Sequence, residues 1–106
     1  MEYSTRTEAG YTILELSGEV DLHLSPQARK QILSLLKQSY HLMVDLSAVD
    51  YIDSSGVASL VEGFQVAKTA NLNFGLIGVS EAAMQVLQLA RLDKVFSIYD
   101  TIDDVI

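Results

Sequence analysis

The chain contains no cysteine, and this absence excludes several kinds of chemistry. Without thiols, its 106 residues can form no disulfide and no thiolate metal site, and they supply no cysteine nucleophile. Basic residues are also few, because seven lysines and arginines stand against fourteen acidic residues, for a formal net charge of −7. These cations are scattered, whereas proteins that bind a phosphate backbone cluster them. We therefore expect no nucleic-acid partner.

Long hydrophobic runs are lacking as well. No apolar stretch approaches the roughly 20 residues that a membrane-spanning helix needs, so we expect no direct membrane insertion. The first residues, Met1–Arg6, do not have the charged and apolar regions of a secretory signal, which favours the cytoplasm. A hydrophobic content of 49% with 20% charged residues is typical of a globular protein, and the length suits one domain over residues 1–106.

The periodic segments alternate between strands and helices. The expected strands are Tyr3–Thr7, Tyr11–Val20, Leu42–Val44, Leu72–Val79 and Val95–Tyr99. The expected helices are about Pro26–Gln38, a second beginning close to Ser55, about Ser80–Ala90, and a terminal turn from Thr101. The order ββαβαβαβα predicts an α/β domain with a mixed, mostly parallel β-sheet, crossover helices and an antiparallel opening hairpin.

Local signals define the ends and the core of these elements. Ser25 is expected to cap the first helix through its hydroxyl oxygen, and Ser80-Glu81 is expected to open the third helix. The short apolar run Leu42–Val44 is typical of a central strand that is covered on both faces. Four aromatic residues are expected in the core: Tyr40, Phe64, Phe74 and Phe96.

The segment DLSAVDYIDSSGVASLVEGF, residues 45–64, carries the main functional signal. Apolar residues recur at helical spacing from Val57, so a helix is expected to begin within Asp53-Ser54-Ser55-Gly56. Short polar side chains at such a position cap the exposed amides of the first turn. The same amides also favour a bound phosphate group. The motif therefore admits two roles, a helix cap, for which Ser54 and Asp53 are the expected residues, and a site of modification.

Catalysis by the chain itself is not supported by its residues. A serine hydrolase needs a base, and neither His23 nor His41 is placed by the sequence beside Ser55. The Gly-x-Ser-x-Gly elbow is also missing, because Asp53 stands two residues before Ser55. We assign no catalytic residue and expect that the protein is not an enzyme.

Three acidic residues, Asp45, Asp50 and Asp53, are expected near the carboxyl end of the third strand, where α/β sheets commonly bind ligands. Their spacing matches no dedicated metal-binding loop, and the Asp-x-Asp-x-Asp-Gly run of calcium sites is missing. We interpret them as solvated loop carboxylates or turn caps, and expect neither a metal ion nor a cofactor.

Four segments together resemble a known family. They are SGEVDLHLSP (residues 17–26), VDLSAVDYIDSSGV (44–57), LIGVS (76–80) and ARLDKVFSIY (90–99). In order and spacing they are similar to the STAS domains of bacterial anti-sigma factor antagonists, over nearly the full chain. The Asp-Leu-Ser and Asp-Ser-Ser-Gly pairing is the most specific part of this resemblance.

The resemblance implies a partner-switching cycle. In such proteins, a GHKL-type serine kinase that is also the anti-sigma factor phosphorylates the second serine of Asp-Ser-Ser-Gly, which is Ser55 here. A PPM-type phosphatase removes the phosphate. The unphosphorylated antagonist captures the kinase and releases its client, and the phosphorylated form lets go. Ser54 is a possible secondary acceptor.

The expected partner-binding residues lie around that serine. They are Asp21, Leu22, His23, Leu24, Asp53, Ser54, Gly56 and Val57. Leu22 and Leu24 are expected either at a partner contact or in the core, and Gly56 is expected to keep the hydroxyl accessible. The alternative is a STAS subunit of a lipid-transport ATPase complex, which docks without phosphorylation. Those relatives often replace the first serine of the motif, so the intact Asp-Ser-Ser-Gly favours the switch.

Overall fold

A computed structural model describes residues 2–106 and shows a five-stranded sheet. Its strands, in spatial as well as sequence order, are β1 (Ser4–Glu8), β2 (Tyr11–Val20), β3 (His41–Ile52), β4 (Phe74–Ile77) and β5 (Ile98–Tyr99). β1 pairs with β2 antiparallel, and the three remaining pairs are parallel. The prediction of a mixed, mostly parallel sheet with an antiparallel edge is confirmed.

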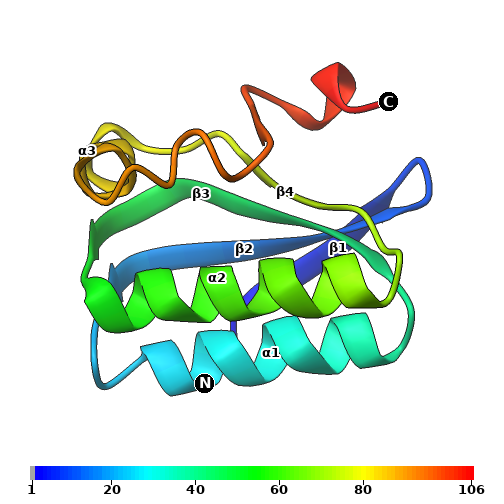
Figure 1. The fold of residues 1–106 in the computed structure, drawn as a ribbon, viewed down its shortest axis with the longest axis horizontal. Coiled ribbons are helices and arrows are strands. Elements are labelled where there is room, and N and C mark those ends of the chain that lie inside the picture. Colours follow the sequence, from blue (N-terminus) through cyan, green and yellow to red (C-terminus); the bar gives the residue numbers. More distant parts are fainter. Residues whose placement is uncertain (1) are drawn as a thin grey trace.

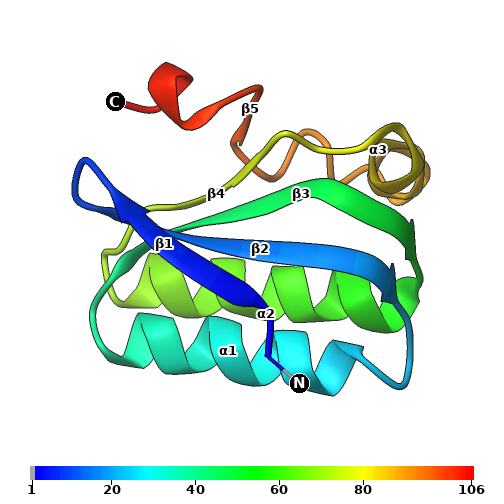
Figure 2. The same cartoon turned by 180° about the vertical axis from the view of Figure 1, so that it is seen from behind.

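Helices lie on both sides of this sheet. α1 (Ser25–Lys37) and α2 (Ser54–Thr69) lie next to each other against one face, while α3 (Glu81–Leu89) lies on the opposite side (Figure 1). The carboxyl-terminal segment, with the short 3-10 helix η1 (Ile102–Asp104), is also on the side of α3, as the reverse view shows (Figure 2). The predicted terminal turn is thus a 3-10 helix, in which the Thr101 amide donates to Asp104 Oδ2 at 3.2 Å.

The alternation of strand side chains builds two apolar layers. Residues on the face toward α1 and α2 form the larger core, which includes Leu14, Leu16, Val44, Ile32 and Leu60. Residues on the other face form a smaller cluster with the terminal segment: Ile13, Met43, Ile77 and Ile102. A strand buried on both faces reads as a continuous apolar run, which explains the Leu42–Val44 segment of β3.

The prediction that β3 ends near Val44 is wrong, because the strand continues to Ile52. Leu46, Val49 and Ile52 are all buried, and the register against β2 shifts twice along this stretch. Each shift adds a residue to one strand, which breaks the two-residue alternation by which strands are recognised. Asp45 and Asp50, interpreted as loop residues, therefore lie within a strand.

Other predicted boundaries also change. β4 and β5 are shorter than predicted, although the carbonyl oxygens of Asn73 and Ser97, just before them, still accept hydrogen bonds from the neighbouring strands. Ser25 does not cap α1, because the helix already begins at this residue and its side chain is buried. Tyr40 is 45% exposed and lies outside the core, whereas Phe74 and Phe96 are buried as expected. α3 opens at Ser80-Glu81 as predicted, and the Ser80 Oγ caps it by accepting from Ala83 N at 3.2 Å.

α1 and α2 are packed closely enough to require a glycine between them. A Cβ at Gly63 would lie 2.6 Å from Ile32 Cγ2 and 3.0 Å from a ring carbon of Phe74. On the outer side, the Arg29 guanidinium donates two hydrogen bonds to the Glu62 carboxylate, at 2.7 and 2.9 Å. These bonds lower the pKa of Glu62. The two helices therefore form one rigid layer below the sheet.

The extension of β3 can be tested at its centre. We expect Leu46→Ala to lower the free energy of unfolding by about 2–5 kcal/mol, since Leu46 is fully buried and its removal leaves a cavity. Asp50→Ala, at an exposed position of the same strand, is the control and should change it by less than about 0.5 kcal/mol. Urea unfolding measures both values. If both substitutions changed the free energy of unfolding by equally small amounts, Leu46 would lie in a loop and not in the strand.

Candidate functional site

The candidate site lies where β2 and β3 end. The last pair between these strands joins Val20 to Ile52, and the Asp53 amide donates to the Val20 carbonyl oxygen at 3.3 Å. The connection from β2 to α1 and the start of α2 are consequently neighbours, although about 30 residues separate them in the sequence. This geometry brings the expected Asp21–Leu24 and Asp53–Val57 groups together.

Asp53 caps α2. Its Oδ1 accepts hydrogen bonds from the Ser55 amide at 2.9 Å and from the Gly56 amide at 3.2 Å. The Ser55 hydroxyl donates to the same oxygen at 2.5 Å. The prediction of an Asp53 cap is confirmed. Ser54 does not share this role, since it is the exposed first residue of the helix.

The environment of Asp53 favours its ionised form. The hydrogen bond from the Ser55 hydroxyl is the largest influence that lowers the pKa of this carboxyl. Partial desolvation opposes it, and the backbone amides of Gly56, Ser55 and Leu22 add to the lowering. The positive end of the α2 dipole acts in the same direction. Asp53 therefore carries its full negative charge at neutral pH, directly beside the Ser55 oxygen.

Gly56 is required by packing. A Cβ at this position would lie 2.7 Å from the Val20 carbonyl oxygen and 2.7 Å from Ile52 Cγ1. The residue is buried, so the expectation that it offers surface to a partner is wrong, whereas the accessibility of the Ser55 hydroxyl to a kinase stays a prediction. The missing side chain instead lets the first turn of α2 lie against the ends of β2 and β3. Ser55, next to it, is half-buried.

The connection between β2 and α1, residues 21–24, is called the Asp21 loop. Its first residue holds it in a tight turn. Asp21 Oδ1 accepts from the amides of His23 at 3.0 Å and Leu24 at 3.1 Å, and the Asp21 carbonyl accepts from Ser25 at 2.7 Å. Because the turn satisfies its own backbone, its side chains can point outward. Leu22 is 71% exposed and Leu24 is 41% exposed, which excludes the alternative that they pack in the core.

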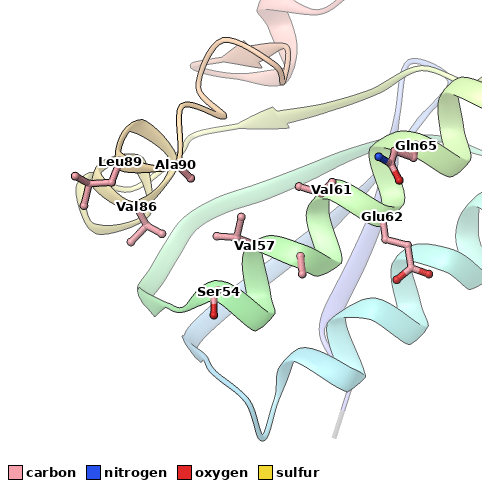
Figure 3. Close-up of a pocket in the computed structure, with 9 residues that line it drawn as sticks. Ser54, Val57, Val61, Glu62, Gln65, Val86, Leu89 and Ala90 are labelled. Carbon is pink, nitrogen blue, oxygen red and sulfur yellow. The ribbon is translucent and has the colours of Figure 1, made fainter.

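A groove between α2 and α3 begins at Ser54 (Figure 3). It has a volume of about 650 Å³, and Val57 and Val61 of α2 lie opposite Val86 of α3. Leu89 of α3 also lines it and is 86% exposed. Val57, an expected partner-binding residue, thus faces the groove. The side of the groove formed by α3 was missed in the sequence.

A signal for that second wall does exist in the sequence. Between Ala82 and Leu89 only Gln85 and Gln88 are polar, so α3 carries more apolar side chains than one helix face can bury. The excess indicates an exposed apolar surface, but the neighbour that completes a groove follows only from the packing of α3 near the start of α2. Sequence reasoning therefore could not name Val86 and Leu89 as site residues.

The described part of the chain gives two further results. Among residues 2–106, no three acidic or histidine side chains come together in an arrangement that could hold a metal ion. Asp45 and Asp50 lie along β3 and Asp53 is engaged as a cap, so these three do not form a cluster. No helix within the same residues is long and apolar enough to cross a bilayer.

The close packing of Gly56 leads to a stability prediction. We expect Gly56→Ala to lower the free energy of unfolding by about 1–3 kcal/mol, because the added methyl group collides with the Val20 carbonyl and Ile52. Ser54→Ala, two residues earlier and exposed, should change it by less than about 0.5 kcal/mol. Chemical denaturation followed by circular dichroism compares them. If Gly56→Ala left the free energy of unfolding unchanged, the neighbouring atoms would accommodate the added methyl group without loss of stability.

The cap predicts a pH dependence with a defined sign. A carboxyl whose pKa is lower in the folded chain stabilises the fold above its unfolded pKa, and this contribution is lost as the pH falls through the folded pKa. We expect Asp53→Ala to lower Tm by about 4–8 °C at pH 7. The difference should shrink below about pH 4, where an unfolded carboxyl begins to protonate.

Asp53→Asn provides the matched control for this pH dependence. The amide oxygen still accepts from the Ser55 and Gly56 amides but does not titrate, so its Tm difference from Asp53→Ala should stay nearly constant with pH. Thermal unfolding between pH 2 and 7 measures all three proteins. If the Tm difference between the unmodified protein and Asp53→Ala grew toward acidic pH, the result would contradict the lowered pKa of Asp53.

Comparisons with known proteins place this geometry in a family. The STAS domain model matches residues 2–105. An anti-sigma F factor antagonist of Paenibacillus polymyxa is 27% identical over 93 residues, which cover 86% of this chain and 80% of that protein. An anti-sigma-B factor antagonist of Bacillus subtilis (strain 168) is 26% identical over 85 residues, which cover 80% of this chain and 78% of that protein.

A solved structure agrees with these sequence matches. The crystal structure of an anti-sigma factor antagonist from Mycobacterium paratuberculosis superposes with a TM-score of 0.83 at 28% identity, covering 96% of this chain and 87% of that chain. The family model and the superposition agree with the resemblance of the four motif segments to STAS domains. The chain belongs to the STAS domain family.

Proposed function

We propose that this protein is a partner-switching regulator of the anti-sigma factor antagonist type. Its unphosphorylated form binds an anti-sigma factor that is also a GHKL-type serine kinase, and this binding releases the client of that kinase in the cytoplasm of a bacterium. Phosphorylation of Ser55 abolishes the binding, and a PPM-type phosphatase restores it. The names of the similar antagonists support the class of partner.

One observation carries the proposal: the Ser54-Ser55 pair lies between two exposed apolar surfaces. On one side, the Asp21 loop presents Leu22 and Leu24 to solvent. On the other side, the groove between α2 and α3 begins at Ser54. Exposed apolar patches beside a polar centre are typical of protein interfaces. A single charge change at Ser55 would therefore fall inside a partner-binding surface.

The position of Ser55 fits a reversible modification. In the kinase step, the Ser55 oxygen bonds to the γ-phosphorus of ATP, ADP leaves and the hydroxyl proton is released. In the phosphatase step, water replaces the serine oxygen on phosphorus and inorganic phosphate leaves. The added group carries about −1.5 to −2 charges at pH 7, and the amides at the start of a helix tolerate such an anion. The fold is thus expected to survive both steps.

The same phosphate would oppose binding. An interface must desolvate the new charge, which costs several kcal/mol when no partner charge compensates it. The Asp53 carboxylate, 2.5 Å from the Ser55 oxygen, is already ionised and adds repulsion. Asp21, in the adjoining loop, contributes a second negative charge nearby. The site is therefore arranged to bind in one charge state and to release in the other.

The serine is a substrate in this proposal, and the protein performs no catalysis itself. The hydroxyl of Ser55 donates to a carboxylate that serves as a helix cap and not to a histidine base. His41, at the start of β3, accepts from Asn73 N at 3.0 Å. The chemistry belongs to the kinase and the phosphatase. Ser54, which is exposed at the groove, is the secondary acceptor.

The partner switch is tested with two variants of one residue. We expect Ser55→Ala to fold and to bind the cognate kinase persistently, because it cannot be phosphorylated. Ser55→Asp should fold but lose at least about 100-fold in affinity, equivalent to about 2.7 kcal/mol. Isothermal titration calorimetry measures the affinities, and mass spectrometry of the Ser54-Ser55 peptide after incubation with kinase and ATP locates the phosphate.

Two outcomes would decide against the switch. A peptide without phosphate, together with unchanged binding of Ser55→Asp, would favour a docking subunit of a lipid-transport ATPase complex, for which the same apolar surfaces suffice. Unfolding of both Ser55 variants would reduce the serine to a structural role. Ser54→Asp is the matched control for charge, because it adds a carboxylate one residue away from the hydroxyl that Asp53 holds.

A further inference from the structure

Phosphorylation of Ser55 is incompatible with the present position of the Asp53 side chain. Ser55 Oγ and Asp53 Oδ1 lie 2.5 Å apart, a separation that requires the hydroxyl proton between them. When a phosphoryl group replaces that proton, two acceptor oxygens face each other without a donor. The Asp53 carboxylate must then move away from the phosphorylated residue.

The amides that Asp53 leaves behind are suited to a phosphate. Asp53 Oδ1 accepts from the Ser55 and Gly56 amides, which belong to the first turn of α2 and have no partner within the helix. A phosphate attached to Ser55 is more highly charged than a carboxylate and offers three acceptor oxygens. Helix amides of this kind are a common binding site for phosphate. The helix therefore stays capped while the capping group changes.

The Asp53 carboxylate also lies beside the Asp21 loop, because the Asp53 amide donates to the Val20 carbonyl oxygen just before that loop. The Leu22 amide is near enough to contribute to the lowering of the Asp53 pKa. The next two amides of the loop, those of His23 and Leu24, are bound instead by Asp21 Oδ1. Movement of Asp53 would thus change the surroundings of the Leu22 amide and leave the other two amides bound, and the side chain of Leu22 is apolar and 71% exposed.

We propose that phosphorylation of Ser55 exchanges the cap of α2: the phosphate takes over the Ser55 and Gly56 amides, and the displaced Asp53 carboxylate moves away from the neighbouring Leu22 amide. The inference rests on the proposed modification of Ser55. It adds that one phosphate alters the binding surface at two places, through its own charge at α2 and through the shape of the Asp21 loop.

The experiment uses the full chain with phosphoserine incorporated during translation at position 55. Because no kinase is involved, its result does not depend on whether the proposed kinase modifies this residue. NMR follows the side-chain carboxyl carbon of Asp53 during a pH titration. We expect its proton affinity to rise at least about tenfold over the unmodified chain, since the carboxylate loses its donors and gains an anionic neighbour.

Two backbone measurements complete the test. The Ser55 and Gly56 amide protons should shift as the phosphate passes its second ionisation near pH 6, because they are bound to it. Hydrogen exchange at the Leu22 amide should accelerate, while exchange in the core strands stays unchanged. Asp53→Ala, without any phosphate, should accelerate Leu22 exchange in the same way.

Phosphoserine at position 54 is the matched control, because it adds the same charge beside the exposed groove and leaves the Ser55 hydroxyl on Asp53. Exchange at Leu22 should then remain as in the unmodified chain. Equal effects at the two positions would show a general charge effect and overturn the cap exchange. The cap exchange would also be overturned if the Asp53 carboxyl titrated identically with and without phosphoserine at position 55. The same conclusion would follow if the Ser55 and Gly56 amide protons did not shift as the phosphate ionises.

Discussion

The Asp53 carboxylate is the group on which the site depends. One of its oxygens holds the Ser55 hydroxyl and the amides of Ser55 and Gly56, so it determines where α2 begins and where the serine oxygen points. The backbone amide of Asp53 donates a hydrogen bond to the carbonyl oxygen of Val20, at the end of β2. Strand and helix consequently meet at this one residue, beside the loop that follows β2.

The packing of the sheet makes this meeting possible. The register shifts in β3 carry the strand as far as the end of β2, and Gly56 then lets α2 start against both strand ends. Gly63 brings α2 against α1, which leaves the other side of α2 free to face α3 across the apolar groove. Small residues at two positions of one helix thus decide how near the helix lies to its neighbours.

Features that depend on a few adjacent residues were predictable. The turn at Ala9-Gly10, whose φ angles are 51° and 86°, and the caps at Asp53 and Ser80 follow from local hydrogen bonding and backbone preference. Features that depend on distant segments were not. The length of β3 is set by its pairing with β2. Tyr40 is exposed because other segments of the fold do not cover its side chain. The groove needs α3, some 30 residues after α2 begins.

The sequence by itself determined the α/β order, the helix start at Asp53-Ser54-Ser55-Gly56 and the family resemblance, because these reside in periodicity, short capping patterns and motif spacing. The tertiary structure decided which groups share the site. It turned Gly56 from an accessible residue into a packed one, and it exposed Leu22 beside the serine. The reason is physical: burial and proximity arise from chain segments far apart in sequence, whose separation no local pattern encodes.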